Sequence, residues 1–127
     1  MLRAAFALIL IGSAGYAAPV DRDAVDAGRL DKALSNYVAG APQSCLGLTR
    51  PTLSSRTYGS TVIYGTGNRI WRTELVGGCR PYEHDALITR TTQSRSCRGD
   101  IVEVRDLLSN VTRGSCSFGD FVEYRRR

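Results

Sequence analysis

The chain has 127 residues, of which 43% are hydrophobic and 23% are charged, and its formal net charge at pH 7 is +5. This length allows one ordinary domain, and the composition excludes global disorder and a collagen-like repeat. Nothing in these totals indicates an activity.

Residues 1–17 have the composition of a secretory signal peptide. Arg3 supplies a positive charge, an apolar run follows it, and Gly15 and Ala17 are small residues suited to a cleavage site before Ala18. The apolar run is far shorter than the roughly 20 residues of a membrane span. We therefore expect cleavage near Ala17 and export, with a buried N-terminal helix as the alternative, and no transmembrane segment.

The stretch Asp21–Ala39 has the spacing of an amphipathic helix. Its apolar residues recur every three or four positions and would form one stripe, made of Ala27, Leu30, Leu34, Tyr37 and Val38. Asp21 or Asp23 can cap the N-terminus, and Gly40 is a suitable C-terminal stop. We expect residues 18–43 to form an N-terminal helical segment.

Residues 44–127 are predicted to form a disulfide-stapled β-rich domain. Short runs rich in Val, Ile, Thr, Tyr and Arg alternate there with Gly-containing turns. Ser60–Tyr64 and Arg69–Leu75 flank the turn sequence Gly-Thr-Gly-Asn and are predicted to form a hairpin. The further strand candidates are Asp85–Thr91, Ile101–Asp106 and Phe121–Arg125.

Alternation within these runs predicts which face each side chain takes. Trp71, Thr73 and Leu75 would share one face of their strand, and Val102 and Val104 would share one face of theirs. The predicted fold class is therefore α+β and mostly β. We expect an N-terminal helix followed by a curled antiparallel sheet, or a small barrel, of five or six strands.

Four cysteines predict two disulfides. An even number in a short exported chain indicates disulfides, here with three possible pairings among Cys45, Cys79, Cys97 and Cys116. No two cysteines are close enough in sequence for a typical zinc site or redox pair. Cys45–Cys79 with Cys97–Cys116 is the preferred pairing, because sequential pairs close compact loops.

Several short motifs around the cysteines resemble a known group of proteins. They are C-L-G-L at Cys45, G-G-C at Cys79, C-R-G-D at Cys97 and G-S-C at Cys116. This pattern resembles small exported proteins of Gram-negative bacteria that carry a domain of unknown function. The resemblance implies a periplasmic or secreted location and a small disulfide-bonded β-rich domain. It implies no activity and supplies no catalytic residues.

His84 is the single candidate for a catalytic side chain. It is the chain's one histidine and stands between Glu83 and Asp85, so it could act as a general acid or base. The alternative interpretation is a surface histidine between a turn and a strand. Zinc-hydrolase, serine-hydrolase and P-loop motifs are missing from the sequence, and we expect no cofactor and no metal.

A small secreted nuclease is the alternative function. It would use His84 with Glu74 or Glu103 as acid and base, and Arg72 or Arg98 to stabilise a phosphoryl transition state. Arginines occur along every predicted strand, however, with acids interspersed among them. The sequence therefore favours a protein that is not an enzyme.

The expected function is binding in the periplasm or outside the cell, with the partner unidentified. An inhibitor of a foreign hydrolase is one specific form of this hypothesis. The positive excess lies after Gly40 and predicts a weak, salt-sensitive attraction to anionic polymers or lipid headgroups. Arg125, Arg126 and Arg127 could make such contacts or form a solvated tail. The aromatic residues considered for partner contact are Tyr58, Tyr64, Trp71 and Tyr82, with Trp71 favoured for the core.

Overall fold

The computed structural model describes residues 12, 15, 18–46, 54–90 and 94–127. These residues form one helix, α1 (Arg22–Leu34), and a seven-stranded sheet. The strands are β1 (Tyr37–Gln43), β2 (Ser55–Tyr58), β3 (Thr61–Tyr64), β4 (Arg69–Val76), β5 (Asp85–Arg90), β6 (Ile101–Asp106) and β7 (Val111–Arg126). The predicted signal peptide, residues 1–17, lies outside the described residues apart from Gly12 and Gly15. No helix in the described part of the chain is long and apolar enough to cross a membrane.

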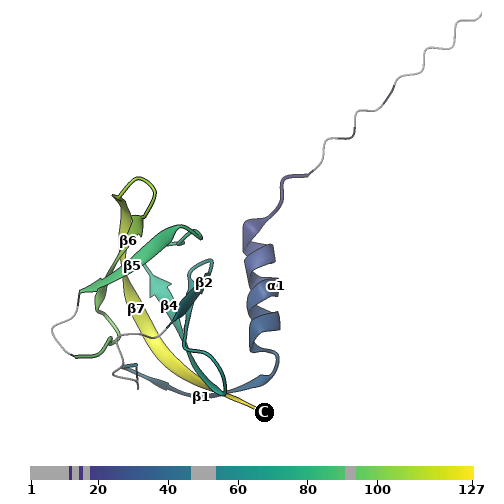
Figure 1. Ribbon diagram of the computed structural model, residues 1–127. Helices are drawn as coiled ribbons and strands as arrows, with labels where there is room; N and C mark the ends of the chain where they lie inside the picture. Colours follow the sequence, from purple (N-terminus) through teal and green to yellow (C-terminus); the bar gives the residue numbers. More distant parts are fainter. Residues whose placement is uncertain (1–11, 13–14, 16–17, 47–53, 91–93) are drawn as a thin grey trace, which may run out of the picture.

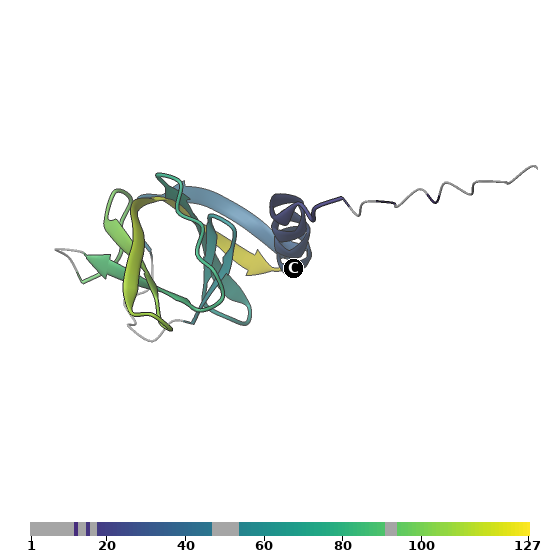
Figure 2. The ribbon, with the colours of Figure 1, turned by 90° about the horizontal axis from the view of Figure 1, so that it is seen from above.

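The sheet is antiparallel throughout and curls into a half-barrel (Figures 1 and 2). Six strands follow one another in the order β2-β3-β4-β7-β6-β5, and β1 also pairs with β7. The predicted class, α+β and mostly β with a curled antiparallel sheet, is confirmed. The sheet contains more strands than the five or six predicted, because β1 and β2 were not expected from the sequence.

The helix is shorter than the sequence predicted. Asp21 caps it, accepting a hydrogen bond from the Asp23 amide at 3.0 Å, so α1 begins near the start of the chain and not at its first residue. It ends at Leu34, whereas Tyr37 and Val38 belong to β1 and lie opposite Arg126 and Arg125 of β7. Aromatic and β-branched residues favour strands, and pairing with β7 satisfies the backbone there.

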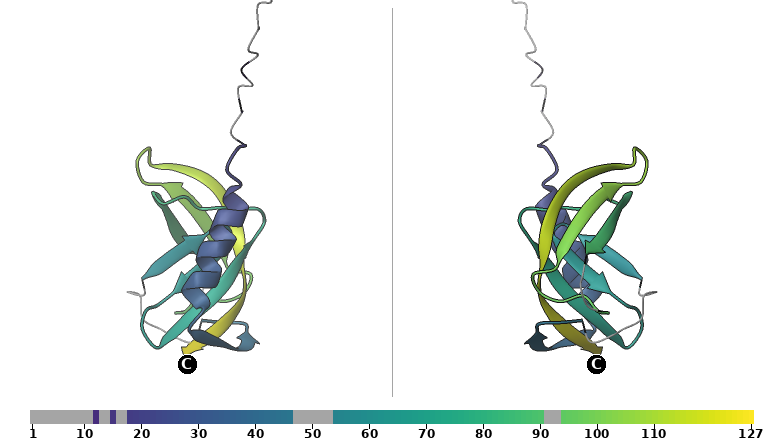
Figure 3. Two further views of the ribbon diagram at one scale, coloured as in Figure 1. Left: turned by 90° about the vertical axis from the view of Figure 1, so that its right-hand side faces the viewer. Right: turned by 90° about the vertical axis from the view of Figure 1, so that its left-hand side faces the viewer.

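Two apolar clusters hold the fold together. The inner cluster fills the concave side of the sheet and includes Trp71, Phe118 and Phe121, all almost completely buried. Each such side chain contributes roughly 1.5–3 kcal/mol by leaving water. On the outer side, Leu30 of α1 packs against Ile63 and Ile70, so the helix lies across an outer face of the sheet (Figure 3).

The predicted strand faces are confirmed. Trp71, Thr73 and Leu75 are buried on the inner face of β4, and Val102 and Val104 are buried on β6. Arg72 and Glu74, which alternate with them on β4, are less buried, whereas Ile70 on that same face is covered by α1. Period-two alternation therefore predicted the faces correctly for both strands.

Both disulfides form, but the predicted pairing is wrong. The bonds join Cys45 to Cys97 and Cys79 to Cys116. Strands β1 and β6 lie one after the other along the same side of β7, opposite β4. Cys45 follows β1 and Cys97 precedes β6, so the two meet at that junction.

The second bond follows from the register between β4 and β7. Val76, the last residue of β4, lies opposite Ser117. Cys79 comes three residues later in the chain, which brings it beside Cys116 of β7. Sheet register, and not the shortest loop, therefore decides which cysteines pair.

Candidate functional site

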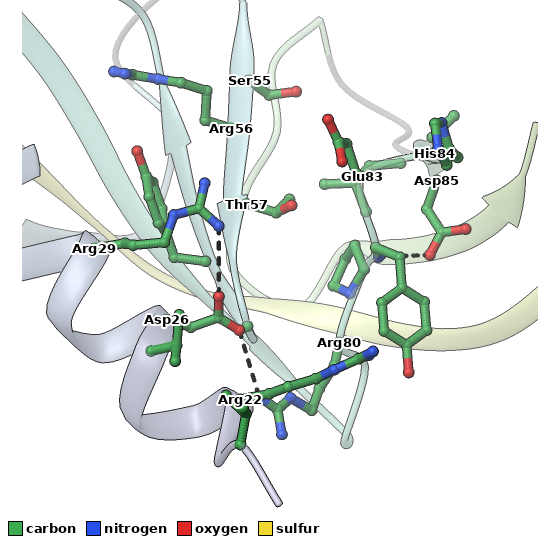
Figure 4. A pocket seen from close by; sticks show the side chains of 18 residues that line it. Arg22, Asp26, Arg29, Ser55, Arg56, Thr57, Arg80, Glu83, His84 and Asp85 are labelled. Atoms are coloured by element: carbon green, nitrogen blue, oxygen red, sulfur yellow. Dashed lines mark hydrogen bonds and ion pairs between the residues drawn. The ribbon is translucent and has the colours of Figure 1, made fainter.

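The half-barrel is open between its two end strands, β2 and β5, and a groove of about 930 Å³ lies at that opening. Its three walls come from α1, from β2 and from the segment that leads into β5 (Figure 4). We call it the β2–β5 groove. Its lining consists of Val20, Arg22, Val25, Asp26, Arg29, residues 55–59 and residues 80–87.

Arg80 joins two walls of the groove. Its guanidinium forms ion pairs with Asp23 and, at 3.7 Å, with Asp26, both on α1. Asp26 also faces Arg29 at 3.9 Å, so this carboxylate lies between two guanidinium groups (Figure 4). Gly59 passes close by with φ +60°, and a Cβ there would come within 3.3 Å of Arg80 Nη2. These ion pairs hold the segment that leads into β5 against α1.

Asp85 orders the turn that forms the third wall. One carboxylate oxygen accepts hydrogen bonds from the Tyr82 amide at 2.7 Å and from Arg113 Nη1 at 2.9 Å, and the side chain is only 1% exposed. The Tyr82 ring has the guanidinium carbons of Arg22 and Arg113 at 5.4 and 4.2 Å from its centroid. Two cation–π contacts therefore hold an aromatic ring at the rim of the groove.

His84 lies in the lining of the groove and is exposed. Its backbone oxygen accepts a hydrogen bond from the Leu107 amide at 3.0 Å, which attaches this wall to the β6–β7 hairpin. Within the described part of the chain, no hydrogen bond or ion pair involves the imidazole itself. Glu83 and Asp85 are its sequence neighbours in the lining, and Asp85 is already engaged with Arg113.

The other residues of the nuclease hypothesis lie outside the groove lining. Glu74 contacts Thr61 and Arg72, and Arg72 also reaches the Tyr124 hydroxyl. Glu103 pairs with Arg90, and Arg98 pairs with Asp120. The structure therefore does not bring Glu74, Glu103, Arg72 or Arg98 together with His84.

Exposed apolar side chains border the groove. Val20, Val25 and Tyr82 line it. The Leu107 amide bonds to the His84 oxygen in the lining, and Leu107, Leu108 and Val111 are all exposed at this end of the β6–β7 hairpin. We call residues 107–111 the hairpin tip. Leu108 is 78% exposed, and with Leu107 and Val111 it gives this turn three exposed apolar side chains, a grouping that is more informative than a single exposed leucine. The sequence predicted none of this patch except Tyr82, because exposure of apolar residues depends on the tertiary fold.

The turn at the hairpin tip is held by its own hydrogen bonds. Asp106 Oδ1 accepts a bond from the Leu108 amide at 2.8 Å. Hydrogen bonds from the backbone of Leu108 and Ser109 lower the pKa of Asp106 below its usual value, so the carboxylate stays charged and keeps the turn closed. Asn110 has φ 57°, a left-handed conformation that asparagine tolerates.

The remaining predicted residues lie in different places. Trp71 is in the inner core, Tyr64 packs against that core, and Tyr58 lines the groove. Arg125, Arg126 and Arg127 line a second cavity of about 520 Å³, together with Asn68 and Arg69. None of the described residues form a group of three or more His, Cys, Asp or Glu side chains suited to a metal ion.

Comparison with protein-family models, with curated proteins and with solved structures finds no match to this chain.

Proposed function

We propose that this is an exported binding protein that captures an extended segment of another protein in the β2–β5 groove. The observation that carries the proposal is the opening of the half-barrel between two strand edges, with exposed apolar side chains around it. Two disulfides fit a protein that works in an oxidising compartment outside the cytoplasm.

The strand edges favour an extended occupant. In the described residues, β2 pairs only with β3 and β5 pairs only with β6, so each presents a row of unpaired backbone groups at the opening. Every pair of neighbouring strands is antiparallel, so β2 and β5 themselves run in opposite directions. A segment added between them would pair antiparallel with one edge and parallel with the other.

The rim favours a partner with apolar side chains. Leu107 and Leu108 project from a turn that is already ordered, so contact with a partner costs little conformational entropy. Contiguous exposed apolar surface with a polar border is typical of a protein-binding site. Arg56 lines the groove and has no ion-pair partner among the described residues, so the segment should also carry a carboxylate.

A displayed library of short linear peptides tests the proposal. We expect selected peptides to be rich in apolar residues and to contain an acid, and Leu108→Ser should weaken their binding at least about tenfold. Val111→Ser and Val76→Ser form a matched pair, because both valines are 56% exposed but only Val111 lies at the hairpin tip. Weaker binding is expected for Val111→Ser alone.

Amide exchange measured on the complex locates the peptide. Strand addition should protect amides of β2 and β5, whereas β1 should not change. The proposal would be contradicted if Val111→Ser and Val76→Ser lost peptide affinity equally. It would also be contradicted if the complex showed no added amide protection in β2 or β5.

The alternative function, a nuclease that uses His84, is tested by an RNA cleavage assay. Purified protein incubated with RNA should give no cleavage above that of the His84→Ala variant, because the predicted acids and arginines do not surround His84. Cleavage that disappears in His84→Ala would overturn a function limited to binding.

A further inference from the structure

Four arginines gather at the end of the half-barrel away from the hairpin tip, where β4 begins and β7 finishes (Figure 1). They are Arg69, Arg125, Arg126 and Arg127, and with Asn68 they line a cavity of about 520 Å³. We call this the arginine cavity. Three of these arginines are adjacent in sequence, but Arg69 comes from a distant strand and reaches them only through the β4–β7 pairing.

Glu123 fixes the position of two of the guanidinium groups. Its carboxylate accepts hydrogen bonds from Arg69 Nη2 at 3.0 Å and from Arg125 Nε, and it forms an ion pair with Arg69 Nε at 2.9 Å. The Glu123 side chain is largely buried, whereas both arginines extend toward solvent. Arg69 also lies over the Trp71 ring, with its guanidinium carbon 5.1 Å from the ring centroid.

Backbone contacts hold the other side of the cavity. The Arg126 amide donates to the Asn68 oxygen at 2.8 Å, and the Arg127 amide donates to the Asn36 oxygen at 2.9 Å. The Arg126 guanidinium carbon lies 5.6 Å from the centroid of the Tyr37 ring. The strand end is therefore ordered by its neighbours, which places its arginines around the cavity.

Charge and donor capacity both exceed what Glu123 can satisfy. A guanidinium has five N–H groups, and the contacts to Glu123 use two of those on Arg69 and one on Arg125. Two guanidinium groups contact this single carboxylate, and Arg126, which donates to the Tyr37 hydroxyl at 3.4 Å, and Arg127 add two further positive charges to the lining of the cavity. A phosphate group has several oxygens that can accept from different guanidinium groups at once, and a carboxylate has only two.

We propose that the arginine cavity binds a phosphate group. Free inorganic phosphate and the headgroup of an anionic phospholipid share this chemistry, and the two sources are separated below. The site lies apart from the β2–β5 groove and does not depend on the function proposed for it.

Titration with inorganic phosphate is the first arm of the test, followed by amide and arginine side-chain NMR signals. Arg125→Gln should weaken phosphate binding at least about tenfold, since a charge-assisted pair is lost. Arg90→Gln is the matched control, because Arg90 is 71% exposed and pairs with Glu103, while Arg125 is 73% exposed and pairs with Glu123. That control should bind phosphate as the unmodified protein does.

Sedimentation with vesicles is the second arm. Phosphatidylglycerol vesicles are compared with phosphatidylcholine vesicles, which carry a phosphate but no net charge. Binding of inorganic phosphate that depends on Arg125 supports the proposal for a free ion, and Arg125-dependent binding to phosphatidylglycerol vesicles alone supports it for a lipid headgroup.

Arg127→Gln provides a second variant if Arg125→Gln does not fold, because the Arg127 side chain makes no hydrogen bond or ion pair with a described residue. This substitution should weaken binding of whichever ligand the unmodified protein binds, inorganic phosphate or phosphatidylglycerol vesicles. Absence of binding in both arms, or an equal loss in Arg90→Gln, would overturn the proposal.

Discussion

Tyr64 shows how burial alone changes the chemistry of a side chain. It lies on the inner side of the sheet, edge-on to Phe118 with ring centroids 6.3 Å apart. Burial raises its pKa from 10.0 to about 12, because the phenolate would lose its hydration. The folded protein therefore prefers the neutral phenol more strongly than the unfolded chain does.

This preference predicts a specific loss of stability in alkali. Because the pKa is higher in the folded state, the contribution of Tyr64 is complete below pH 10 and is lost as the pH rises toward 12. We expect the loss to reach about 2 kcal/mol at the upper end. Urea unfolding of the protein and of Tyr64→Phe at several pH values measures it. The difference in unfolding free energy between the two proteins should change between pH 10 and 12. A difference that stays constant would contradict a raised pKa for Tyr64.

At the level of elements, replacing a glycine by alanine should have opposite effects on the free energy of unfolding at two positions, one in the helix and one in a strand. Gly28 lies within α1, and a Cβ there would have no atom within 4 Å. Gly119 lies in β7, where a Cβ would approach the Glu74 backbone oxygen at 3.1 Å. The helix position has free space, and the strand position does not.

Gly28→Ala should therefore raise the free energy of unfolding by roughly 0.5–1 kcal/mol, because alanine is the better helix former. Gly119→Ala should lower it, since a strand must move to accept the methyl group. Denaturant unfolding followed by circular dichroism gives both values. If Gly28→Ala were destabilising, the helix would have a contact at that position that the structure does not contain.

Local sequence patterns predicted some elements well and others poorly. Ile101–Asp106 was predicted with the observed bounds, because alternation and the preceding Gly-Asp turn agree. β1 was assigned to the helix, since Tyr37 and Val38 continue the helical spacing and only β7, far along the chain, makes them a strand. β2 is short and half exposed, so it has little alternation to detect.

The candidate sites were harder to predict for the same reason. Tyr82 and His84 were identified because each is chemically distinctive in the sequence. The groove itself depends on how α1, β2 and the segment before β5 meet, which no local pattern encodes. Likewise the run Arg125–Arg127 is visible in the sequence, whereas Arg69 joins it only through strand pairing.

For the whole molecule, the two disulfides link parts of the sheet that are distant in sequence. Their separations of 52 and 37 residues correspond to roughly 4 kcal/mol each in the chain-entropy description. Removing either bond with a Cys→Ala pair should therefore lower stability by several kcal/mol, which thermal unfolding would detect.

The pairing of the cysteines can be tested separately. Non-reducing peptide mapping should recover Cys45 with Cys97. A peptide joining Cys45 to Cys79 would contradict the observed register.

The position of β7 in the sheet has a consequence for how the chain folds during synthesis. A chain that emerges from its N-terminus can form β2-β3-β4 and the β5-β6 hairpin early, because these strands are neighbours in sequence. Yet β4, β6 and β1 are all joined through β7, the last strand to emerge. The complete sheet therefore cannot assemble until β7 has emerged, and until then the early strand pairs remain separate units without their shared central strand.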